Sequence, residues 1–273
     1  MSYFTHKDLP VGIPKFLEKY LPQTQHNHDK LPFITLTYAQ SLDSRISKKR
    51  GLRTVISHIE TKVVTHYIRS LHDALLIGIN TVLADDPGLN CRFESKPQRI
   101  ITPVIIDPNF RLQYVYAHSK LEKNVSSGSI NQPIVVVSSK VLEMMGESIK
   151  KFAGAHQLRI LAIEPHTAGT GVTIDGIKEP VLSWCQIFKA LKQDFHIQSV
   201  MVEGGAGVIN SLLVSEYNHK SIVDSLIITI GPVFLGKDGV EVSPADEVDL
   251  ENVSWWTGIR DSIMCSDVKK KQI

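Results

Sequence analysis

Hydrophobic residues in this chain alternate between short continuous runs and longer amphipathic stretches. Runs rich in Val, Ile and Leu occupy residues 33–39, 74–79, 101–107, 133–139, 159–163 and 199–204. Continuous apolar runs of this length are typical of strands that are covered on both faces of a sheet. We therefore predict a buried strand for each run.

Three stretches between these runs have the spacing of amphipathic helices. In residues 60–72, one helical stripe collects Val63, Val64, Tyr67, Ile68 and Leu71. Residues 141–154 and 181–195 follow the same pattern. Because strands and helices alternate along the chain, the pattern predicts an α/β fold.

The last part of the chain departs from this alternation. Residues 225–235 and 253–268 are two strand-like runs separated only by a loop. This arrangement predicts antiparallel strands at one edge and therefore a mixed sheet. Trp255 and Trp256 fall on opposite faces of a strand, so at least one of them is expected in the core or in a subunit contact.

Residues 1–31 have a different character. They are polar, and Pro10, Pro14 and Pro22 exclude a long regular helix. We predict an N-terminal arm over residues 1–31 that lies over a single domain formed by residues 32–273.

Composition limits the classes of protein to which the chain can belong. Its 273 residues are 42% hydrophobic, which is enough for a well-buried core. The 30 Lys and Arg residues nearly balance the 28 Asp and Glu residues, giving a formal charge of +2. That balance predicts no nucleic-acid partner, because nucleic-acid binding usually needs a basic stripe. A small anionic ligand needs only a local basic site.

The cysteines and the termini point to a reducing compartment. Cys91, Cys185 and Cys265 are far apart and form no CxxC pair, so neither disulfides nor a thiolate zinc site is predicted. No membrane partner is expected, because the start lacks a signal-peptide pattern and no apolar run approaches the ~20 residues that span a bilayer. We expect a cytoplasmic protein, with the nucleus also open.

Residues 26–29 are the only stretch that resembles a metal site. They read His-Asn-His-Asp, which are metal-ligand types. They stand in the arm without a second cluster, and we predict no metal.

The stretch VEGGAGVINSLL at residues 202–213 places a glycine turn between a strand and a helix. Glu203 ends the strand, and Gly204, Gly205, Ala206 and Gly207 follow. Glycines allow a ligand to approach the backbone, and free N–H groups at a helix start favour a phosphate. The spacing is not GxGxxG, so the usual dinucleotide fingerprint is absent. Phosphate binding and a plain structural turn both remain open.

A second stretch, GINTVLADDPGLNCR at residues 78–92, has the same form. Gly78 ends a strand, Asn80 or Thr81 is placed to cap a short helix, and a Pro-Gly pair ends it. If both strands run in the same direction, the two glycine turns meet at the carboxyl edge of the sheet, where α/β sheets bind ligands. Arg92 can then meet a phosphate, or it can be an exposed arginine without a specific contact.

Two acidic residues are candidates for chemistry. The Glu203 carboxylate ends an apolar strand and must find hydrogen-bond donors, either ligand hydroxyl groups or the backbone. Asp43 follows the first strand in the stretch SLDSR, which locally reads as a polar turn. Asp85 can equally belong to a solvated turn before Pro87.

Three blocks together carry a resemblance to a known family. PFITLTYAQSLDSRIS, HYIRSLHDALLIGINTVLADDPGLNCR and VMVEGGAGVINSLL occur in this order. They resemble the riboflavin-biosynthesis reductases, most closely the stand-alone fungal and archaeal type, from about Pro32 to Cys265. The resemblance implies a dihydrofolate-reductase-like fold with a mixed, mostly parallel sheet and flanking helices, and a homodimer.

The resemblance also implies an activity and a site. Members use NADPH to convert the ribosylamino group of a pyrimidine ribosyl 5′-phosphate into ribitylamino, and NADH remains possible here. Substrate contacts are implied for Arg69, Leu89, Arg92 and Glu203. Cofactor contacts are implied for Thr81, Asp85, Ile163, Gly204, Gly205, Ala206, Gly207, Val208 and Ile209.

The chain departs from bacterial relatives at three positions. Arg53 and Val55 replace a Ser and a Trp that contact ligands, and Arg45 replaces a lysine. Ligand contacts after the first strand are therefore expected to differ.

The implied reaction assigns roles to the acidic residues. Hydride transfer to C1′ of the ring-opened imine, with protonation of the imine nitrogen, gives the ribityl chain. Glu203 would bind ribose hydroxyl groups and assist ring opening, and Asp43 is the next candidate for proton transfer. The chain lacks the zinc-deaminase pattern of an HxE followed by a PCxxC, so we expect reductase activity alone. A dihydrofolate reductase and a nucleotide-binding protein without catalysis are the alternatives.

Overall fold

The computed structural model describes residues 3–23, 30–95, 98–165, 172–174 and 177–269. A nine-stranded sheet forms its centre, in the order β14-β15-β12-β1-β9-β3-β4-β5-β6. The strands are β1 (Phe33–Gln40), β3 (Ala74–Gly78), β4 (Thr102–Ile106), β5 (Ile134–Ser138), β6 (Arg159–Ile163), β9 (Ser199–Gly204), β12 (Ser225–Ile230), β14 (Leu250–Thr257) and β15 (Ser262–Val268). All pair in parallel except β14 and β15. The predicted mixed, mostly parallel sheet is confirmed.

The edge near the carboxyl terminus differs from the prediction in two ways. Residues 225–230 form β12, which pairs antiparallel with β15 as predicted, but it also pairs in parallel with β1 and so lies inside the sheet and not at its edge. Residues 253–268 do not form one strand, because the chain turns between Gly258 and Asp261 and folds β14 back on β15. The Gly258 N–H donates to the Asp261 carbonyl at 2.9 Å and closes this hairpin.

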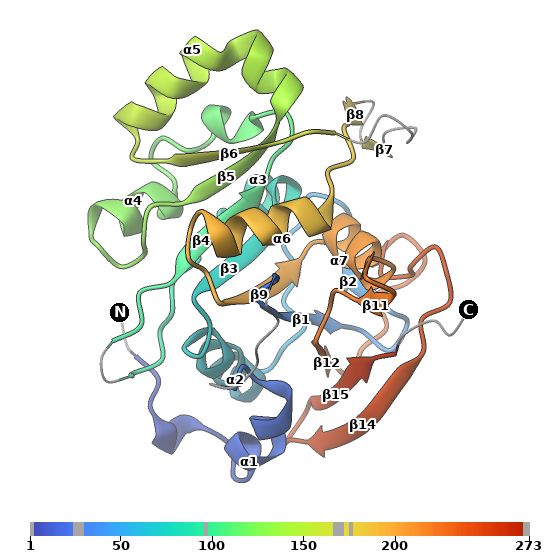
Figure 1. Cartoon of the computed structure of the whole chain (residues 1–273). Helices are drawn as coiled ribbons and strands as arrows, with labels where there is room; N and C mark the ends of the chain where they lie inside the picture. Colours follow the sequence, from blue (N-terminus) through green and yellow to red (C-terminus); the bar gives the residue numbers. More distant parts are fainter. Residues whose placement is uncertain (1–2, 24–29, 96–97, 166–171, 175–176, 270–273) are drawn as a thin grey trace.

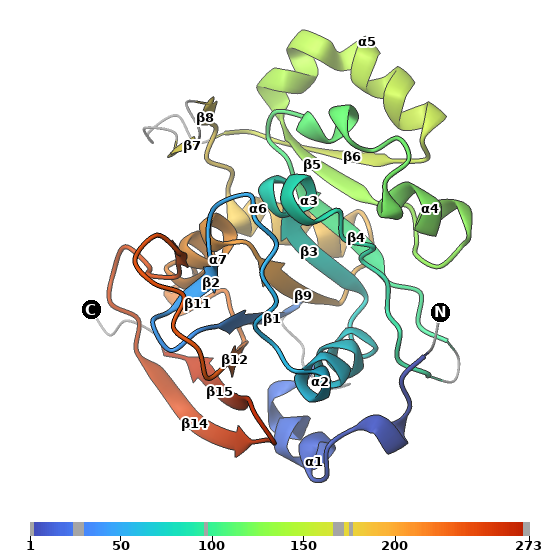
Figure 2. The ribbon, with the colours of Figure 1, turned by 180° about the vertical axis from the view of Figure 1, so that it is seen from behind.

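Helices cover both faces of the sheet, as Figures 1 and 2 show from opposite sides. Helices α6 and α7 contribute buried side chains to one apolar cluster, and α1 to α5 contribute to the other. The helices are α1 (Ile13–Leu17), α2 (Ile59–Arg69), α3 (Ile79–Asp85), α4 (Lys120–Ser126), α5 (Ser139–Ala155), α6 (Trp184–Gln193) and α7 (Ala206–Leu213). The three helices expected from spacing correspond to α2, α5 and α6.

Shorter elements complete the described chain. Three 3₁₀ turns are η1 (His6–Asp8), η2 (Glu18–Tyr20) and η3 (Arg111–Tyr114). Three small antiparallel pairs are β2 (Arg45–Ser47) with β13 (Val240–Glu241), β7 (Val172–Ile174) with β8 (Ile177–Glu179), and β10 (Glu216–Tyr217) with β11 (Lys220–Ser221).

The N-terminal arm is more than a surface cover. Within residues 3–23 it forms only short turns, as its prolines predict. Ile13, Leu17 and Tyr20 are nevertheless almost fully buried in the cluster that contains Val64 and Ile68 of α2. Burying side chains of this size contributes about 1.5–3 kcal/mol each. The arm is therefore part of the hydrophobic core.

Membrane insertion through a helix finds no support in the part of the chain that the structure describes. None of its helices combines the length and the apolar character that crossing a bilayer requires.

Two buried histidines lie on the α2 side of the sheet. His72 is fully buried, with Nδ1 at 2.8 Å from the Ile68 carbonyl and Nε2 at 2.8 Å from the Thr35 hydroxyl. These partners assign the proton to Nδ1. Burial lowers the pKa of His72 to about 4, and burial together with Arg69 and Arg92 lowers the pKa of His66 to about 2.

These histidines predict a loss of stability in mild acid. An unfolded histidine titrates near 6.5, so below that pH the unfolded chain binds more protons than the folded chain. We expect each histidine to lower the free energy of unfolding by up to about 1.4 kcal/mol per pH unit between roughly pH 6 and its folded pKa. Urea unfolding from pH 7 to 5 measures this slope. His72→Gln should flatten it, and the exposed His118→Asn should not; equal slopes in all three proteins would contradict the assignment.

Candidate active site

The two glycine turns predicted from the sequence lie side by side. Strands β3 and β9 are parallel neighbours, with Ile77 opposite Gly204. A Cβ placed on Gly205 would lie 3.0 Å from the Thr81 Oγ1, and one on Gly78 would lie 3.0 Å from the Val208 Cγ2. The structure thus brings both turns together at the carboxyl edge of the sheet, because the strands that precede them run in the same direction.

The helices that follow these turns begin without a capping side chain. Helix α3 begins after Gly78 and α7 after Gly205. The predicted cap by Asn80 or Thr81 is wrong, because α3 already begins at Ile79 and both residues lie inside it. By contrast, side chains cap the starts of α2, α4 and α6. The first N–H groups of α7 therefore remain available for an anionic ligand.

The residues of the second turn differ in what they expose. Gly204 is buried and Ile209 has its side chain in the core, so Ile209 can meet a ligand only through its backbone. Gly205, Ala206 and Val208 are partly exposed and Gly207 is exposed. Exposed backbone at glycines allows an anionic ligand to approach the N–H groups closely, so this turn is suited to bind a phosphate.

Two of these glycines provide a matched pair for mutation. Gly204 has a φ of +104°, and a Cβ there would lie 3.0 Å from the Ile209 Cδ1. Gly207 has ordinary φ and open space around it. We expect Gly204→Ala to lower the free energy of unfolding by about 1–3 kcal/mol, and Gly207→Ala to leave it within about 0.5 kcal/mol. Urea unfolding tests this; equal losses in both variants would contradict the strained turn.

Glu203 and Arg69 form a nearly buried ion pair. The Arg69 Nε donates to one carboxylate oxygen and Nη2 to the other, both at 2.6 Å. The side chain of Arg69 is 15% exposed and that of Glu203 is 18% exposed. The Arg69 Nη1 also donates to the Asn90 carbonyl at 2.9 Å. Burial opposes charge on the guanidinium, but the Glu203 carboxylate outweighs it and raises the pKa of Arg69.

This pair resolves the question of what satisfies Glu203. From the sequence, the expected hydrogen-bond donors to Glu203 are ligand hydroxyl groups or the backbone. In the structure the donor is the Arg69 side chain, 134 residues away in the chain. No local signal in the sequence announces this pairing. A bidentate arginine holds the carboxylate in one orientation, with its remaining lone pairs free for a ligand.

Arg92 stands beside His66 of α2 and the ring of Phe4. Its Nε and Nη2 lie 3.1 Å and 2.9 Å from the His66 Nε2, and its Cζ lies 5.7 Å from the Phe4 ring centre. No carboxylate of the described residues pairs with Arg92. It is a fixed guanidinium whose charge is not neutralised by the described part of the protein.

Asp43 has a structural part in this fold. Its carboxylate accepts hydrogen bonds from the Ser41 hydroxyl and from the backbone N–H groups of Leu235 and Gly236, at 3.0 Å and 2.7 Å. The Ser41 and Leu235 hydrogen bonds lower the pKa of Asp43 to about 2. A carboxyl group with that pKa is ionised at neutral pH and is a poor proton donor. These contacts agree with the local reading of a polar turn and argue against Asp43 as a proton donor.

The remaining cofactor candidates lie on strand and helix ends. Thr81 and Asp85 are both in α3 and partly exposed. Burial raises the pKa of Asp85, although Arg53 and Lys120 lie close enough to oppose the rise. Ile163 ends β6 and is only 5% exposed. Its side chain is packed in the core, so only its backbone is available to a ligand.

Leu89 and Arg45 both make structural contacts within the protein. Leu89 is 2% exposed and has a φ of +47°, so it is an anchor of the turn and offers a ligand only its backbone. Arg45, which replaces a lysine of related chains, pairs with Glu241 at 2.6 Å and joins β2 to β13.

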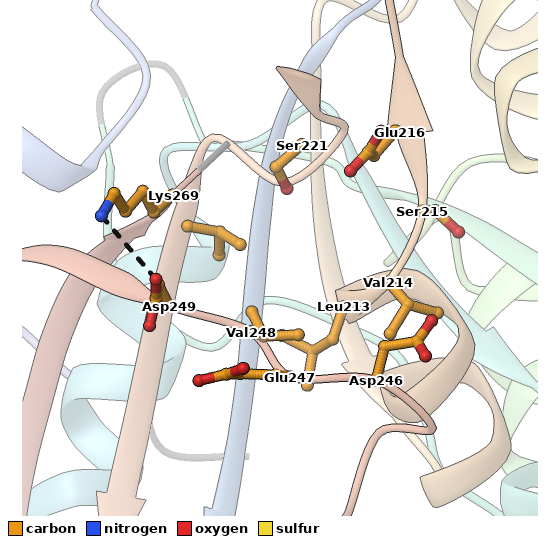
Figure 3. A pocket seen from close by; sticks show the side chains of 11 residues that line it. Leu213, Val214, Ser215, Glu216, Ser221, Asp246, Glu247, Val248, Asp249 and Lys269 are labelled. Atoms are coloured by element: carbon orange, nitrogen blue, oxygen red, sulfur yellow. Dashed lines mark ion pairs between the residues drawn. The ribbon is translucent and has the colours of Figure 1, made fainter. Parts of the chain in front are cut away.

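A pocket of about 210 Å³ lies elsewhere in the molecule (Figure 3). It is lined by residues 213–216, Ser221, residues 246–249, Val268 and Lys269, and includes none of the candidate site residues. Four of the lining residues carry a carboxylate and one is a lysine, which pairs with Asp249 at 3.7 Å. Such a pocket repels phosphates, so it is not the candidate active site.

A metal centre is not found among the residues that the structure describes. They contain no group of three or more His, Cys, Asp or Glu side chains placed to hold an ion. The stretch at residues 26–29 lies outside the described residues.

The chain is similar to proteins of one family over almost its whole length. The model of the RibD C-terminal domain matches residues 32–264. A Debaryomyces hansenii protein named 2,5-diamino-6-ribosylamino-4(3H)-pyrimidinone 5′-phosphate reductase is 47% identical over 262 residues, covering 94% of this chain and 97% of that protein. A Saccharomyces cerevisiae protein of the same name is 43% identical over 256 residues, covering 93% and 94%.

Two solved structures are similar to this chain in fold. The riboflavin biosynthesis reductase Rib7 of Saccharomyces cerevisiae is 41% identical, with a TM-score of 0.73, and the match covers 94% of this chain and 100% of that one. RibD of Acinetobacter baumannii is 19% identical with a TM-score of 0.66, over 88% of this chain and 59% of that one, which shows a shared fold.

Proposed function

This chain belongs to the RibD C-terminal domain family, and from that membership and the geometry of the site we propose its reaction. It reduces the ribosylamino group of 2,5-diamino-6-ribosylamino-4(3H)-pyrimidinone 5′-phosphate to ribitylamino, using NADPH, in riboflavin biosynthesis. The observation that carries the proposal is the Arg69–Glu203 pair directly before the glycine turn of β9. The pair fixes a carboxylate just before the uncapped start of α7, where we propose that phosphates bind.

A nicotinamide nucleotide fits the two glycine turns. The close contacts between Gly205 and Thr81 leave no room for larger side chains, and the start of α7 offers uncapped N–H groups. We propose that the backbone from Gly205 to Val208 holds the cofactor phosphates and that Thr81 and Asp85 bind its nicotinamide half. When bound, the cofactor supplies the hydride.

The cofactor's identity is a finer part of the proposal. We propose NADPH as the physiological reductant, as the family resemblance implies, and the ratio of kcat/KM for NADPH to that for NADH measures the preference. A ratio below one would reassign the cofactor.

The negative charge of the substrate phosphate is complementary to the charge of Arg92. Arg69 is already paired with Glu203, whereas Arg92 has no carboxylate partner among the described residues. We propose that the planar guanidinium of Arg92 binds the 5′-phosphate. Glu203, held by Arg69, then accepts hydrogen bonds from the ribose hydroxyl groups.

The protein's share of the mechanism is positioning and charge. Opening of the ribosylamine ring places an imine carbon at C1′, and the reacting carbons must be held about 3–3.5 Å apart. Glu203 fixes the sugar by accepting hydrogen bonds from its hydroxyl groups, and it stabilises the open form by accepting one from the hydroxyl group that ring opening frees. Arg92 fixes the phosphate end of the same chain.

The reductase-only proposal is tested by the product's mass. With NADPH and the ribosylamino substrate, the purified chain should give a product that has gained two hydrogen atoms and kept both amino groups on the pyrimidine. A product in which an exocyclic amino group is replaced by oxygen would show deamination and contradict the proposal.

We also propose that the chain forms a homodimer. The edge strand β14 presents the Trp255 side chain, 58% exposed, beside the exposed Val253, whereas Trp256 packs on the core. An exposed apolar sheet edge of this kind is typical of a protein interface. Light scattering should give twice the chain mass, and Trp255→Glu should lower it to one chain; a monomeric parent protein would contradict this.

A further inference from the structure

Two residues without a role in the proposed reaction, His66 and Phe4, contact the Arg92 guanidinium. We propose that His66 and Phe4 are positioning residues for Arg92, so that the N-terminal arm is part of the substrate-phosphate site. This inference rests on the proposed function, because it takes the substrate phosphate as the ligand of Arg92. His66 lies in α2, three residues before Arg69, and Phe4 lies in the arm.

His66 faces Arg92 with both ring nitrogens. Its Nδ1 lies 3.2 Å from the Arg92 backbone N, and its Nε2 lies 2.9 Å and 3.1 Å from two guanidinium nitrogens. The ring is only 6% exposed and is faced by the charges of Arg69 and Arg92. Residues three apart on a helix lie on one side, so α2 presents His66 and Arg69 together to the segment from Asn90 to Arg92.

The His66 imidazole contacts the Arg92 guanidinium but cannot accept hydrogen bonds from all the N–H groups that face it. A neutral imidazole has one acceptor nitrogen, yet N–H donors of Arg92 face both nitrogens. In either tautomer, one of the two contacts sets a donor against a donor. The single lone pair of Nε2 also cannot accept from both guanidinium nitrogens that face it, so the guanidinium keeps N–H groups without an acceptor there and gains by binding an anion.

Phe4 packs against both Arg92 and His66. Its ring centre lies 5.7 Å from the Arg92 Cζ and 5.5 Å from the His66 ring. The backbone fixes this placement, because the Phe4 N–H donates to the Arg92 carbonyl at 2.7 Å and the Glu94 N–H donates to the Phe4 carbonyl at 2.8 Å. The arm thus pairs as a one-residue strand beside residues 92–94.

A pre-positioned arginine binds a phosphate more tightly. A free arginine side chain loses up to about 2 kcal/mol of rotamer freedom when it is ordered on binding. Because the rings of Phe4 and His66 both contact the guanidinium, the side chain is ordered when the protein folds and not when the substrate binds. Loss of either residue should therefore raise KM for the phosphorylated substrate and leave kcat unchanged.

The test compares the substrate with its 5′-dephosphorylated nucleoside. We expect Phe4→Ala and His66→Phe to lower the ratio of kcat/KM for the two by about tenfold, which corresponds to about 1.4 kcal/mol. His66→Gln keeps an acceptor and should retain most of the ratio. Tyr3→Ala, which removes an exposed aromatic side chain from the same arm, is the control. Should His66→Phe fail to fold, Phe4→Ala decides alone.

Equal losses on both substrates, or an unchanged ratio in folded Phe4→Ala, would overturn the positioning role. Calorimetric titration with ribose 5-phosphate separates this inference from the proposed function, because it needs no turnover. If the parent chain binds ribose 5-phosphate, and the two variants weaken binding about tenfold, positioning stands even where the reductase assay fails. Equal ribose 5-phosphate affinity in parent and variants would overturn it.

Discussion

Glu203→Gln should lower kcat by about a hundredfold or more and leave the dissociation constant of NADPH within about twofold. Glutamine has nearly the same shape, and its carbonyl can still accept one hydrogen bond from Arg69. It carries no charge, so it loses the charge-assisted contacts both to Arg69 and to the substrate hydroxyl groups. The proposed cofactor cradle begins at the next turn, on the backbone after Gly204, which explains why cofactor affinity should survive.

The matched control for this variant is Glu241→Gln. Glu241 also pairs with an arginine, Arg45, at 2.6 Å, but its side chain is 54% exposed and the pair joins β2 to β13. Its kcat should stay within about twofold of the parent chain, as surface pairs contribute little. Steady-state kinetics and a fluorescence titration of NADPH give both quantities. Unchanged kcat in Glu203→Gln would remove Glu203 from the mechanism.

Arg92→Ala should lower kcat/KM by about a hundredfold, mainly through KM. A hydrogen bond to a charged group contributes about 1.5–3 kcal/mol, and loss of about 3 kcal/mol corresponds to roughly a hundredfold in binding. With the dephosphorylated nucleoside the same variant should match the parent chain, because the lost partner is the phosphate. Steady-state kinetics on both substrates measure this difference.

Arg260→Ala is the control for the loss of one positive charge. Arg260 is exposed in the turn between β14 and β15, and its removal should leave both substrates unaffected. If Arg92→Ala weakens the two substrates equally, Arg92 is not a phosphate ligand.

The regular part of the fold follows from the sequence because its signals are local. Continuous apolar runs mark the parallel strands, and the helical stripe that includes Val64 and Ile68 marks α2. Glycines that end two such runs mark the ligand edge, once both strands are known to run in the same direction. The hairpin of β14 and β15 escapes this reasoning, since Gly258 lies inside a run that is apolar on both sides of the turn.

The contacts within the site depend on tertiary structure and have no such signal. Glu203 reads locally as a carboxylate in search of donors, and only the fold brings Arg69 to it. His66 sits on the buried stripe of α2, where a histidine is most simply a core residue. Asp43 shows the reverse case, because its local reading as a polar turn agrees with its contacts to Leu235 and Gly236.

The most direct test of the account is substrate-dependent oxidation of NADPH by the purified chain, followed by the fall in absorbance of the reduced nicotinamide. The account predicts that NADPH is consumed only when the ribosylamino-pyrimidine phosphate is present, in equal amount to the ribityl product formed. A chain that binds NADPH but consumes none in the presence of that substrate would contradict it.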